Sequence, residues 1–493
     1  MSNSINWGKI YSSSYWGTGI TNTIHWGKVY VDLLVTSVSE IPNLLSTITG
    51  RATTTENLVY TEAKLTEIES DGLLEKASIL LTPTSYGTGV VNAIKPKSAP
   101  FADFAFARSS SATRINSNGI IEDVLTDIPR IDYSTGVGVL KLEHSDTNIF
   151  KHSENFSSTY WKSNNGSVSE EPSGFFDLRP SAKSIKYTST IADENEIFTQ
   201  QNESITSVNT EYTDSFYVKS NTADFFHIFC APSVLFSSTD LLVIDNSTKQ
   251  VVNTASFMSD VVVEDVGNGW VFVSYTYTAL FATSVFHKVY ASSSSSDRTA
   301  GLPIGDSLYM TCVEHGEGLR SSYIPTNGVS TTRAADQGLV SSNLSSLINS
   351  EEGVIYIEAS VFTNTGSNRN IGLSDGTNNN SAKIMLTSVG HIQVTCRNNS
   401  TGSVVKTSLT YSPPLGLTDF NKIAFKYSPN GFAIWLNGVE VKSNNSGNVP
   451  SFGVLDRINF DRGDTFSFYE GNVKAVAVFK EALTDTELQN LTS

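Results

Sequence analysis

Short runs of β-branched and aromatic residues, separated by polar turns, are the feature that most constrains the fold of this chain. Between residues 151 and 336 such runs occur at 184–187, 214–218, 225–229, 241–244, 261–266, 270–277, 286–290 and 308–313. No segment there has the periodicity of a helix, and strands at this spacing are typical of an antiparallel sandwich or jelly roll. We therefore predict a β-sandwich over residues 151–336, with Trp270 in its core.

A second series of strands is predicted over residues 351–493. Its members are 353–361, 371–373, 383–386, 391–396, 421–427, 431–436, 457–460 and 472–479. Asn-Gly pairs supply the positive φ angles of tight turns and predict consecutive hairpins around 430–438. Thr484 followed by Glu487 predicts a capped final helix. The predicted fold class is mostly β: two successive antiparallel β-sandwich (jelly-roll) domains with a linker at 337–350, after an N-terminal docking segment and a short helical connector.

The charge balance excludes one class of partner. The 493 residues include 33 Lys and Arg against 49 Asp and Glu, a net charge of −16. A phosphate backbone requires a cationic surface, so we expect no nucleic-acid partner.

No apolar run reaches the roughly 18 residues of a membrane span, and no secretory signal is visible at the N-terminus. We expect synthesis in a cytoplasm and no membrane insertion.

An internal repeat marks the predicted docking segment, residues 1–55. The sequence INWGKIY at 5–11 recurs as IHWGKVY at 24–30, with YWG at 15–17 between them. So short a segment cannot enclose its tryptophans in a core, and exposed aromatics are the usual anchors of protein interfaces. We predict docking onto another protein through five residues, Trp7, Tyr11, Trp16, Trp26 and Tyr30. A small strand pair packed on the next domain is the alternative.

Residues 56–150 form the predicted connector. Residues 56–81 mix leucines with Glu and Lys and predict a helix, which Gly72 interrupts. This helix is either a coiled-coil seam between identical chains or a connector packed on a neighbouring sheet. The remainder reads as short strands and tight turns, in which Arg108, Arg114, Arg130 and Asp132 are expected to form buried ion pairs.

The connector contains an ordered series of motifs that resembles a segment of tailed-bacteriophage virion proteins. The motifs are DFAFARSSSATRIN at 103–116, NGIIEDV at 118–124, IPRIDY at 128–133 and TNIF at 147–150, followed later by SYIPT at 322–326 and TRAAD at 332–336. At LEHSD, 142–146, the related proteins commonly have a proline, so the local turn differs here. In those proteins the segment precedes carbohydrate-binding or lectin-like sandwiches of tail fibres and tail spikes.

Two further resemblances concern the sandwiches. The element VGNGWVFV at 266–273 is similar to a turn and core strand of many carbohydrate-binding modules, and residues 422–441 and 471–488 resemble the concanavalin-like, laminin-G-like jelly roll. Sugar binding needs flat aromatic rings beside amides or carboxylates. Residues of these types are Tyr160, Trp161, Tyr212, Tyr217, Asn165 and Asp214. Aromatics on strands are also the usual core residues, and that alternative stays open.

No metal or catalytic motif stands out. The cysteines Cys230, Cys312 and Cys396 lack CxxC spacing, and the seven histidines are scattered with none at ligand spacing from another. Calcium is the one candidate ion, held by the loop acids Asp375, Asp461 and Asp464, although such acids are common on an acidic surface.

We expect no enzymatic activity. A tail-spike glycosidase needs two carboxylates in a groove, and the candidates at 193–196 and at Glu314 with Glu317 read as solvated loops. No nucleophile elbow, phosphate-binding loop or dinucleotide fingerprint is present.

The resemblance implies a virion structural protein, a tail fibre or tail-associated receptor-binding protein that is assembled as a homotrimer. Its expected partners are other virion proteins, through the N-terminus, and host cell-surface glycans, reached by residues 351–493 pointing outward. The alternatives are a head fibre or capsid decoration protein, a purely structural appendage, and a glycan-depolymerising tail spike.

Overall fold

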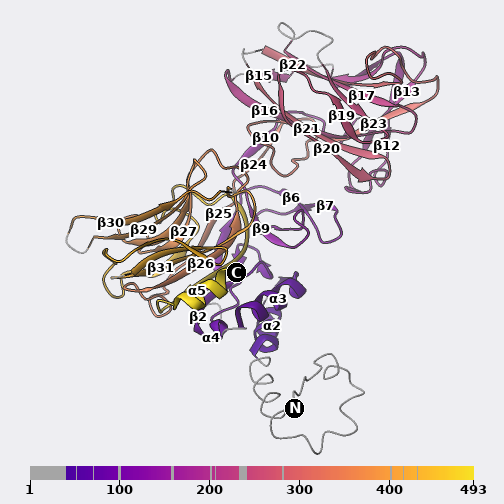
Figure 1. The fold of residues 1–493 in the computed structure, drawn as a ribbon. Helices are drawn as coiled ribbons and strands as arrows, with labels where there is room; N and C mark the ends of the chain where they lie inside the picture. Colours follow the sequence, from indigo (N-terminus) through magenta and orange to yellow (C-terminus); the bar gives the residue numbers. More distant parts are fainter. Residues whose placement is uncertain are drawn as a thin grey trace, which may run out of the picture.

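The fold is mostly β, as predicted, and consists of two β-sandwiches and a small group of helices (Figure 1). The computed structural model describes residues 40–51, 53–69, 72–97, 102–156, 160–199, 203–205, 207–232, 241–279, 283–399, 402–414, 416–429 and 431–493. We call the unit formed by residues 146–333 the inserted sandwich, and the unit formed by residues 54–142 together with 337–493 the C-terminal sandwich.

The inserted sandwich has a six-stranded sheet that faces a seven-stranded sheet. The first contains, in spatial order, β12 (Gly166–Glu171), β13 (Ser184–Ser189), β23 (Ser307–Glu317), β16 (Thr210–Ser220), β21 (Trp270–Ala279) and β20 (Met258–Gly267). The second contains β11 (Trp161–Asn164), β14 (Asn195–Thr199), β22 (Thr283–Ser292), β17 (Phe225–Pro232), β18 (Leu242–Asp245) and β19 (Gln250–Asn253), and β15 (Glu203–Ile205) pairs with β22. Every run predicted between 151 and 336 overlaps one of these strands.

The C-terminal sandwich has a ten-stranded and an eight-stranded sheet. The first contains β1 (Thr54–Thr55), β3 (Ser85–Gly87), β4 (Val90–Val91), β5 (Phe104–Ala107), β25 (Gln337–Ser341), β34 (Arg457–Asn459), β27 (Arg369–Ser374), β28 (Ser381–Leu386), β29 (Ile392–Asn398) and β30 (Val405–Tyr411). The second contains β33 (Val439–Asn444), β32 (Gly431–Leu436), β31 (Asn421–Ser428), β26 (Gly353–Ser360), β35 (Gly471–Phe479), β9 (Val139–Leu142) and β8 (Ile131–Asp132), and β2 (Ala77–Leu81) pairs with β35.

These pairings change the role of the residues that the sequence assigns to a connector and a linker. Strands β1–β5, β8 and β9, from residues 54–142, are built into the two sheets of the C-terminal sandwich, and β25 occupies the start of the predicted linker. The inserted sandwich therefore interrupts the C-terminal sandwich in sequence. The chain leaves the C-terminal sandwich through β10 (Asp146–Asn148) and returns to it through β24 (Thr331–Arg333), and these two strands pair antiparallel. Strands β6 (Ala112–Ile115) and β7 (Ile121–Val124) form a separate hairpin.

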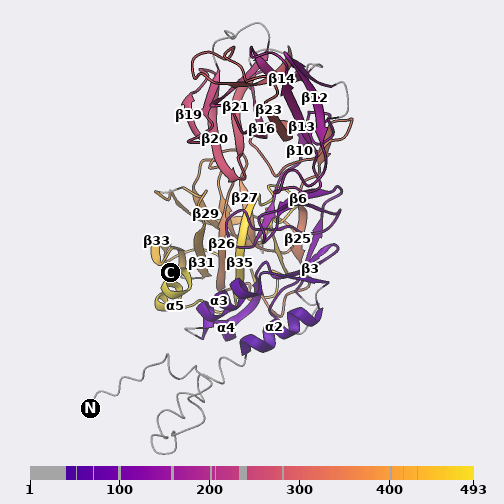
Figure 2. The same ribbon diagram turned by 90° about the vertical axis from the view of Figure 1, so that its right-hand side faces the viewer.

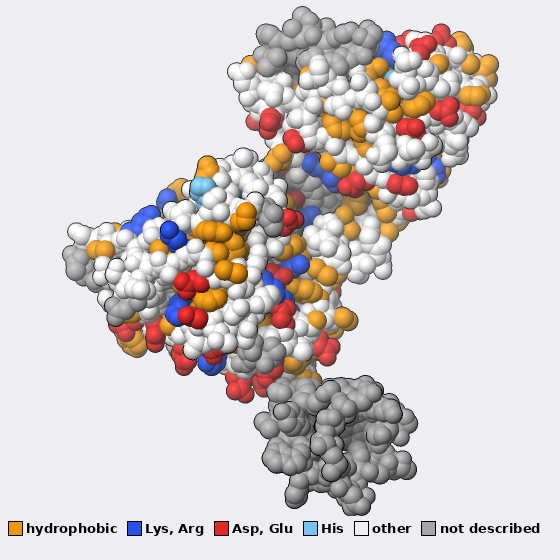
Figure 3. Space-filling view, viewed as in Figure 1, with side chains coloured by type: hydrophobic (Ala, Val, Ile, Leu, Met, Phe, Trp, Pro, Cys, Tyr) orange, Lys and Arg blue, Asp and Glu red, His pale blue; other side chains and the backbone are white. Residues whose placement is uncertain are grey.

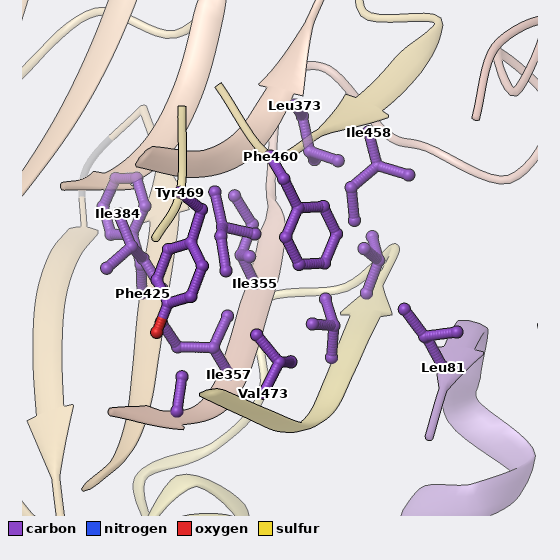
Figure 4. Packing of buried hydrophobic residues seen from close by; sticks show 14 of the residues in the cluster. Leu81, Ile355, Ile357, Leu373, Ile384, Phe425, Ile458, Phe460, Tyr469 and Val473 are labelled. Carbon is purple, nitrogen blue, oxygen red and sulfur yellow. The ribbon is translucent and has the colours of Figure 1, made fainter. Parts of the chain in front are cut away.

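Alternation along β26 sends Ile355 and Ile357 into the core between the sheets and Val354 and Tyr356 toward the helices, so both faces of this strand are buried. In Figure 4, Ile355 and Ile357 of β26 meet Leu373 and Ile458 from the opposite sheet, and Leu81 of β2 reaches the same cluster. Each of these side chains is at most 1% exposed. Burial of this size provides the main favourable free energy of folding. A strand from the predicted connector thus contributes directly to the core of the C-terminal sandwich.

The helices are α2 (Glu40–Arg51), α3 (Leu58–Glu69), α4 (Leu73–Lys76) and α5 (Asp485–Thr492). The predicted helix at 56–81 is confirmed as α3 and α4, and Gly72 interrupts it in the left-handed conformation, but its last residues form β2. Buried residues of α2–α5 share one cluster with side chains of the eight-stranded sheet, as a connector packed on a sheet requires. Thr484 and Glu487 form the predicted capping box of α5.

A buried network of charges joins the two crossings between the sandwiches. Arg108 pairs with Asp336 at 3.0 Å, and Arg130 pairs with Glu143 at 2.6 Å and with Asp336. The backbone N–H of Glu143 donates to Asp336 at 2.9 Å, and Arg333 lies 3.6 Å from Glu143. Burial alone would raise the pKa of Glu143, but the positive charges of Arg130 and Arg333 hold it well below its usual range. The outgoing and returning chains are therefore fixed to each other.

The ion pairs expected in the connector are confirmed, with partners that the sequence did not indicate. Besides Arg108 and Arg130, Arg114 pairs with Glu56 at 2.6 Å, and Asp132 pairs with Lys141 at 3.1 Å. The Arg114–Glu56 pair connects residues that are far apart in sequence and is half-buried, whereas Asp132 is buried and its partner is near in sequence.

The inserted sandwich and helix α2 lie at opposite ends of the molecule (Figures 1 and 2). The C-terminal sandwich adjoins the helices, and the inserted sandwich lies beyond it. No contact of the described residues tests whether residues 351–493 point outward, and this stays a prediction. Uncharged polar side chains and backbone cover most of the face that the described residues present in Figure 3. In the described part of the chain, no helix has the length and apolar character needed to cross a membrane.

Replacing Asp336 with Asn tests the importance of the network. The change leaves Arg108 and Arg130 buried without their shared carboxylate, which costs about 3–5 kcal/mol, or roughly 6–20 °C in the midpoint of thermal unfolding. Calorimetry of the full chain measures the shift. Asp464→Asn is the matched control, because its pair with Arg462 is solvent-accessible and contributes about 0–1 kcal/mol. Equal midpoints for the two variants would contradict the network's role.

Candidate functional site

A cleft of about 390 Å³ lies where the inserted sandwich faces the rest of the chain. One wall is the outer face of the six-stranded sheet, formed by β16, β20, β21 and β23. The other side includes residues of β6–β9, and Phe362 reaches it from the loop after β26. The volume falls within the range of about 300–1,000 Å³ that is usual for small-molecule sites.

The floor of the cleft is a ladder of paired side chains on β16 and β21. The directly opposed pairs are Thr213 with Thr276, Ser215 with Ser274, and Tyr217 with Phe272. Successive strand residues point to opposite faces, so these side chains share one face while the alternate residues of both strands enter the core. The floor is therefore hydroxyl-rich at one end and aromatic at the other.

The aromatic end is combined with a cation. The guanidinium carbon of Arg320 lies 4.2 Å from the centroid of the Phe272 ring, and the rings of Phe272 and Tyr217 are 5.0 Å apart. Arg320 is exposed, and its positive charge favours the ionised form of Glu314 in the same cleft. Phe362 is 36% exposed, against 3% for Phe272 and 8% for Tyr217. Arg320 and Phe362 are therefore accessible to a ligand, as are the lining residues Ser134, Asp260, Val262 and Leu319.

Glu314 on β23 supplies a buried carboxyl group at the cleft. It is 6% exposed and accepts a hydrogen bond from the backbone N–H of Ile324 at 3.1 Å, while its Oε2 has no hydrogen-bond partner among the described residues. Burial raises the pKa of Glu314 to about 8, and the charge of Asp146 adds to the effect. The interpretation of Glu314 as part of a solvated loop is wrong, because it lies within a strand.

A β-bulge determines which way Glu314 points. Ser215 of β16 pairs with Glu314 of β23, and Tyr217 pairs with Thr311, so β23 has one residue more than β16 between these two pairs. Cys312, which lies in this bulge, has a φ of 49°. An extra residue reverses the inward and outward positions beyond it. Glu314 therefore faces the cleft, and His315 faces the core.

The six predicted glycan contacts are not brought together in the cleft. Tyr160, Trp161 and Tyr212 are at most 3% exposed, and their rings pack in the core of the inserted sandwich. Protein side chains occupy their faces, so a sugar could not stack on them without opening the core. Asn165 lies in a turn between β11 and β12 with a φ of 52°.

Tyr217 and Asp214 have different positions in the same strand. Tyr217 lines the cleft, whereas Asp214 is 1% exposed and points into the core.

The sequence interpretation did not select Arg320, Phe362 or the hydroxyl ladder. Alternation along 210–220 could have indicated one face of the floor, but the strand pairing that completes it is not visible in the sequence.

The other predicted sites are separate from this cleft. Trp7, Tyr11, Trp16, Trp26 and Tyr30 lie outside the described residues. The acids proposed for calcium make loop contacts instead of converging. The Asp375 carboxylate accepts a hydrogen bond from the hydroxyl of Thr377 at 2.6 Å. The Asp461 carboxylate accepts one from the side-chain amide of Asn459, the last residue of β34, at 2.7 Å, and Asp464 forms an ion pair with Arg462 at 2.7 Å.

A lysine lies among these loop acids. Lys383 of β28 is 5% exposed and donates to the backbone carbonyl of Arg462 at 2.9 Å. Burial lowers the pKa of Lys383 to about 7, and the nearby charge of Arg397 adds to the effect. When Lys383 is protonated, its positive charge opposes cation binding in these loops.

Replacing Lys383 with Met should change the pH dependence of stability. The unfolded chain keeps Lys383 protonated to about pH 10, whereas the folded chain releases the proton near pH 7. The unfolded state therefore binds more protons in this window, and wild-type stability rises with pH by up to about 1.4 kcal/mol per pH unit relative to the variant. Thermal unfolding at pH 7, 8 and 9 measures this, with exposed Lys406→Met as control. Parallel pH profiles for wild type and Lys383→Met would refute the burial effect.

One group of potential metal ligands is present in the described part of the chain, and the sequence interpretation missed it. Asp214, His287 and His315 are all buried, and a potential ligand atom from each lies within 4.8 Å of the others. The histidines lack ligand spacing in the sequence, but the fold brings two of them together, since the ring centroids of His287 and His315 are 5.0 Å apart. Sequence spacing could not show this, since the histidines come from different sheets.

Comparison with solved structures finds similarity to parts of other β proteins. The CBM40 domain of the Ruminococcus gnavus IT-sialidase, bound to α2,3-sialyllactose, is 16% identical with a TM-score of 0.26, over 29% of this chain and 83% of that chain. The NanB sialidase from Streptococcus pneumoniae is 18% identical with a TM-score of 0.26, over 30% of this chain and 24% of that chain.

A SAP-like pentraxin from Limulus polyphemus is 12% identical with a TM-score of 0.22, over 30% of this chain and 71% of that chain. Scores this low assign neither a ligand nor a family. No protein-family model matches the chain, and no curated protein matches it.

Proposed function

We propose that the cleft binds a glycan and that the chain is a binding protein without catalytic activity. The observation that carries this proposal is the combination, in one cleft, of a ladder of paired hydroxyls with Arg320 and Phe362. A sugar presents hydroxyls that donate and accept hydrogen bonds, and an apolar ring face that packs on an aromatic side chain. The floor offers the first kind of contact, and Phe362 offers the second.

The charges of the cleft support binding rather than hydrolysis. A glycosidase needs two carboxyl groups about 5–9.5 Å apart on either side of the scissile bond. Of the acids lining the cleft, Asp132 is paired with Lys141 and Glu143 with Arg130. These two carboxylates are committed to structural ion pairs. The other two lining acids differ from them, since Glu314 is buried with its pKa raised to about 8 and Asp260 is exposed.

Binding at one cleft should be weak, because the cleft is small and open. Several copies on one particle raise the effective concentration, so that weak sites together give firm attachment. We propose that the chain is an appendage of a tailed-bacteriophage virion, a tail fibre or tail-associated receptor-binding protein assembled as a homotrimer. The ordered motifs at 103–150 and 322–336 support this role, and a head fibre or capsid decoration protein is the second candidate.

Arg320→Gln and Phe362→Ala test the cleft. A glycan array probed with the full chain identifies a ligand, and calorimetry then compares variants. Each change should weaken binding at least about tenfold, a loss of about 1.4 kcal/mol, because each removes an accessible contact. Arg298→Gln is the matched control for Arg320, since its guanidinium also lies over a ring, 5.0 Å from the centroid of Tyr290, away from the cleft. Phe452→Ala, at an 81% exposed surface position, is the control for Phe362.

The results separate the three functions. If no glycan is retained above the level of the double variant Arg320→Gln, Phe362→Ala, the binding proposal fails and a purely structural appendage remains. If the bound glycan is shortened during incubation, the chain is an enzyme.

Deletion of residues 1–30 tests attachment to the particle. The truncated chain should keep its sandwiches, because these residues precede the first helix of the described structure, and it should be absent from purified virions. Immunoblotting of particles measures incorporation, with glycan binding as the control for folding. Normal incorporation would show that Trp7, Trp26 and their neighbours do not dock the protein.

A further inference from the structure

A second polar site lies inside the inserted sandwich, on the opposite face of the strands that form the cleft floor. Asp214 of β16 and His315 of β23 are directly paired across the six-stranded sheet. His287 comes from β22 of the facing sheet. The three side chains are 1%, 0% and 8% exposed, so they bridge the two sheets through the core.

The carboxylate of Asp214 is the centre of this cluster. Its Oδ1 lies 2.6 Å from Nδ1 of His315, and its Oδ2 lies 2.9 Å from Nδ1 of His287. Both imidazoles therefore turn the same nitrogen toward one carboxylate. Two ligands on a tetrahedral zinc ion, at about 2.0–2.2 Å each, lie roughly 3.4 Å apart. The separations of 2.6 and 2.9 Å are hydrogen-bond lengths, so the three side chains converge on one point and would have to move apart by about 0.5–0.8 Å to admit the ion.

The surroundings are dry and rigid. Tyr212 stacks on His315 with ring centroids 5.3 Å apart, and Phe150 packs against His287 at 4.7 Å. A cavity of about 10 Å³, lined by Asp214 and His287 among others, adjoins the cluster. This is about the space that one water molecule needs, so a fourth ligand can be accommodated.

We propose that Asp214, His287 and His315 bind a divalent transition-metal ion, with zinc as the preferred ion. Two imidazoles and one carboxylate suit zinc and its first-row neighbours, whereas calcium takes six to eight oxygen ligands. A carboxylate is costly to bury in an aromatic core, and a cation held between Asp214 and the two imidazoles would offset that cost. The alternative occupant of the cluster is a proton shared through hydrogen bonds. The ion would connect the two sheets and stabilise the sandwich, since it binds the folded state alone.

Metal analysis of the full chain, purified without a histidine tag, tests this site. The wild type, refolded with zinc and dialysed, should hold about one zinc per chain. His315→Gln and Asp214→Asn should hold little. His227→Gln should retain the ion, because His227 is also buried but its Nε2–H donates to the backbone carbonyl of Ser294, outside the cluster.

Two readouts keep the test independent of variant folding. Cobalt added to the metal-free wild type should produce the visible absorption of a tetrahedral site, and a chelator should lower the thermal midpoint of the zinc-loaded wild type. A wild type that holds no zinc after refolding, or a His227→Gln variant that loses zinc as His315→Gln does, would overturn the proposal. Glycan binding is measured separately, so failure of the cleft proposal does not affect this result.

Discussion

The buried ion-pair network at the two crossings is the interaction on which the arrangement of the sandwiches depends. The Asp336 carboxylate accepts from Arg108, from Arg130 and from the backbone N–H of Glu143. Buried charges are stable only when every partner is in place, so the network tolerates one relative position of the outgoing and returning chains. Glu143 also lines the cleft. The contacts that fix the crossing thus fix one side of the candidate site.

The local fold could be predicted from the sequence because alternation and turn residues are local signals. The runs at 270–277 and 472–479 became β21 and β35, and the capped helix at the C-terminus became α5. The insertion could not be predicted, because it depends on which strands pair over long separations. β2 and β35, for example, are nearly four hundred residues apart. Within the motifs at 103–150, β5 and β8 are strands of the C-terminal sandwich, β6 and β7 form the separate hairpin, and β10 begins the inserted sandwich, although their position in the sequence suggests a connector.

The candidate site was harder to predict, because residue type does not determine burial. Trp161 and Tyr212 have the chemistry of sugar contacts, yet alternation places both in the core. Phe362 became a candidate only through its position, since a loop of one sandwich brings it to the face of the other. The bulge at Cys312 also made the site hard to predict. It determines which face of the sheet Glu314 and His315 lie on, and no sequence signal marks it.

Side chains on the two faces of the six-stranded sheet are connected through the backbone of β16 and β23. Asp214 lies between Thr213 and Ser215 on β16, and His315 follows Glu314 on β23. Adjacent strand residues point to opposite faces from a shared backbone, so an interaction that fixes Asp214 and His315 in the core also fixes the neighbouring hydroxyls and carboxyl in the cleft. A preformed floor loses less conformational entropy when a ligand binds. The buried cluster therefore provides a physical reason for a rigid cleft floor, whichever cation it holds.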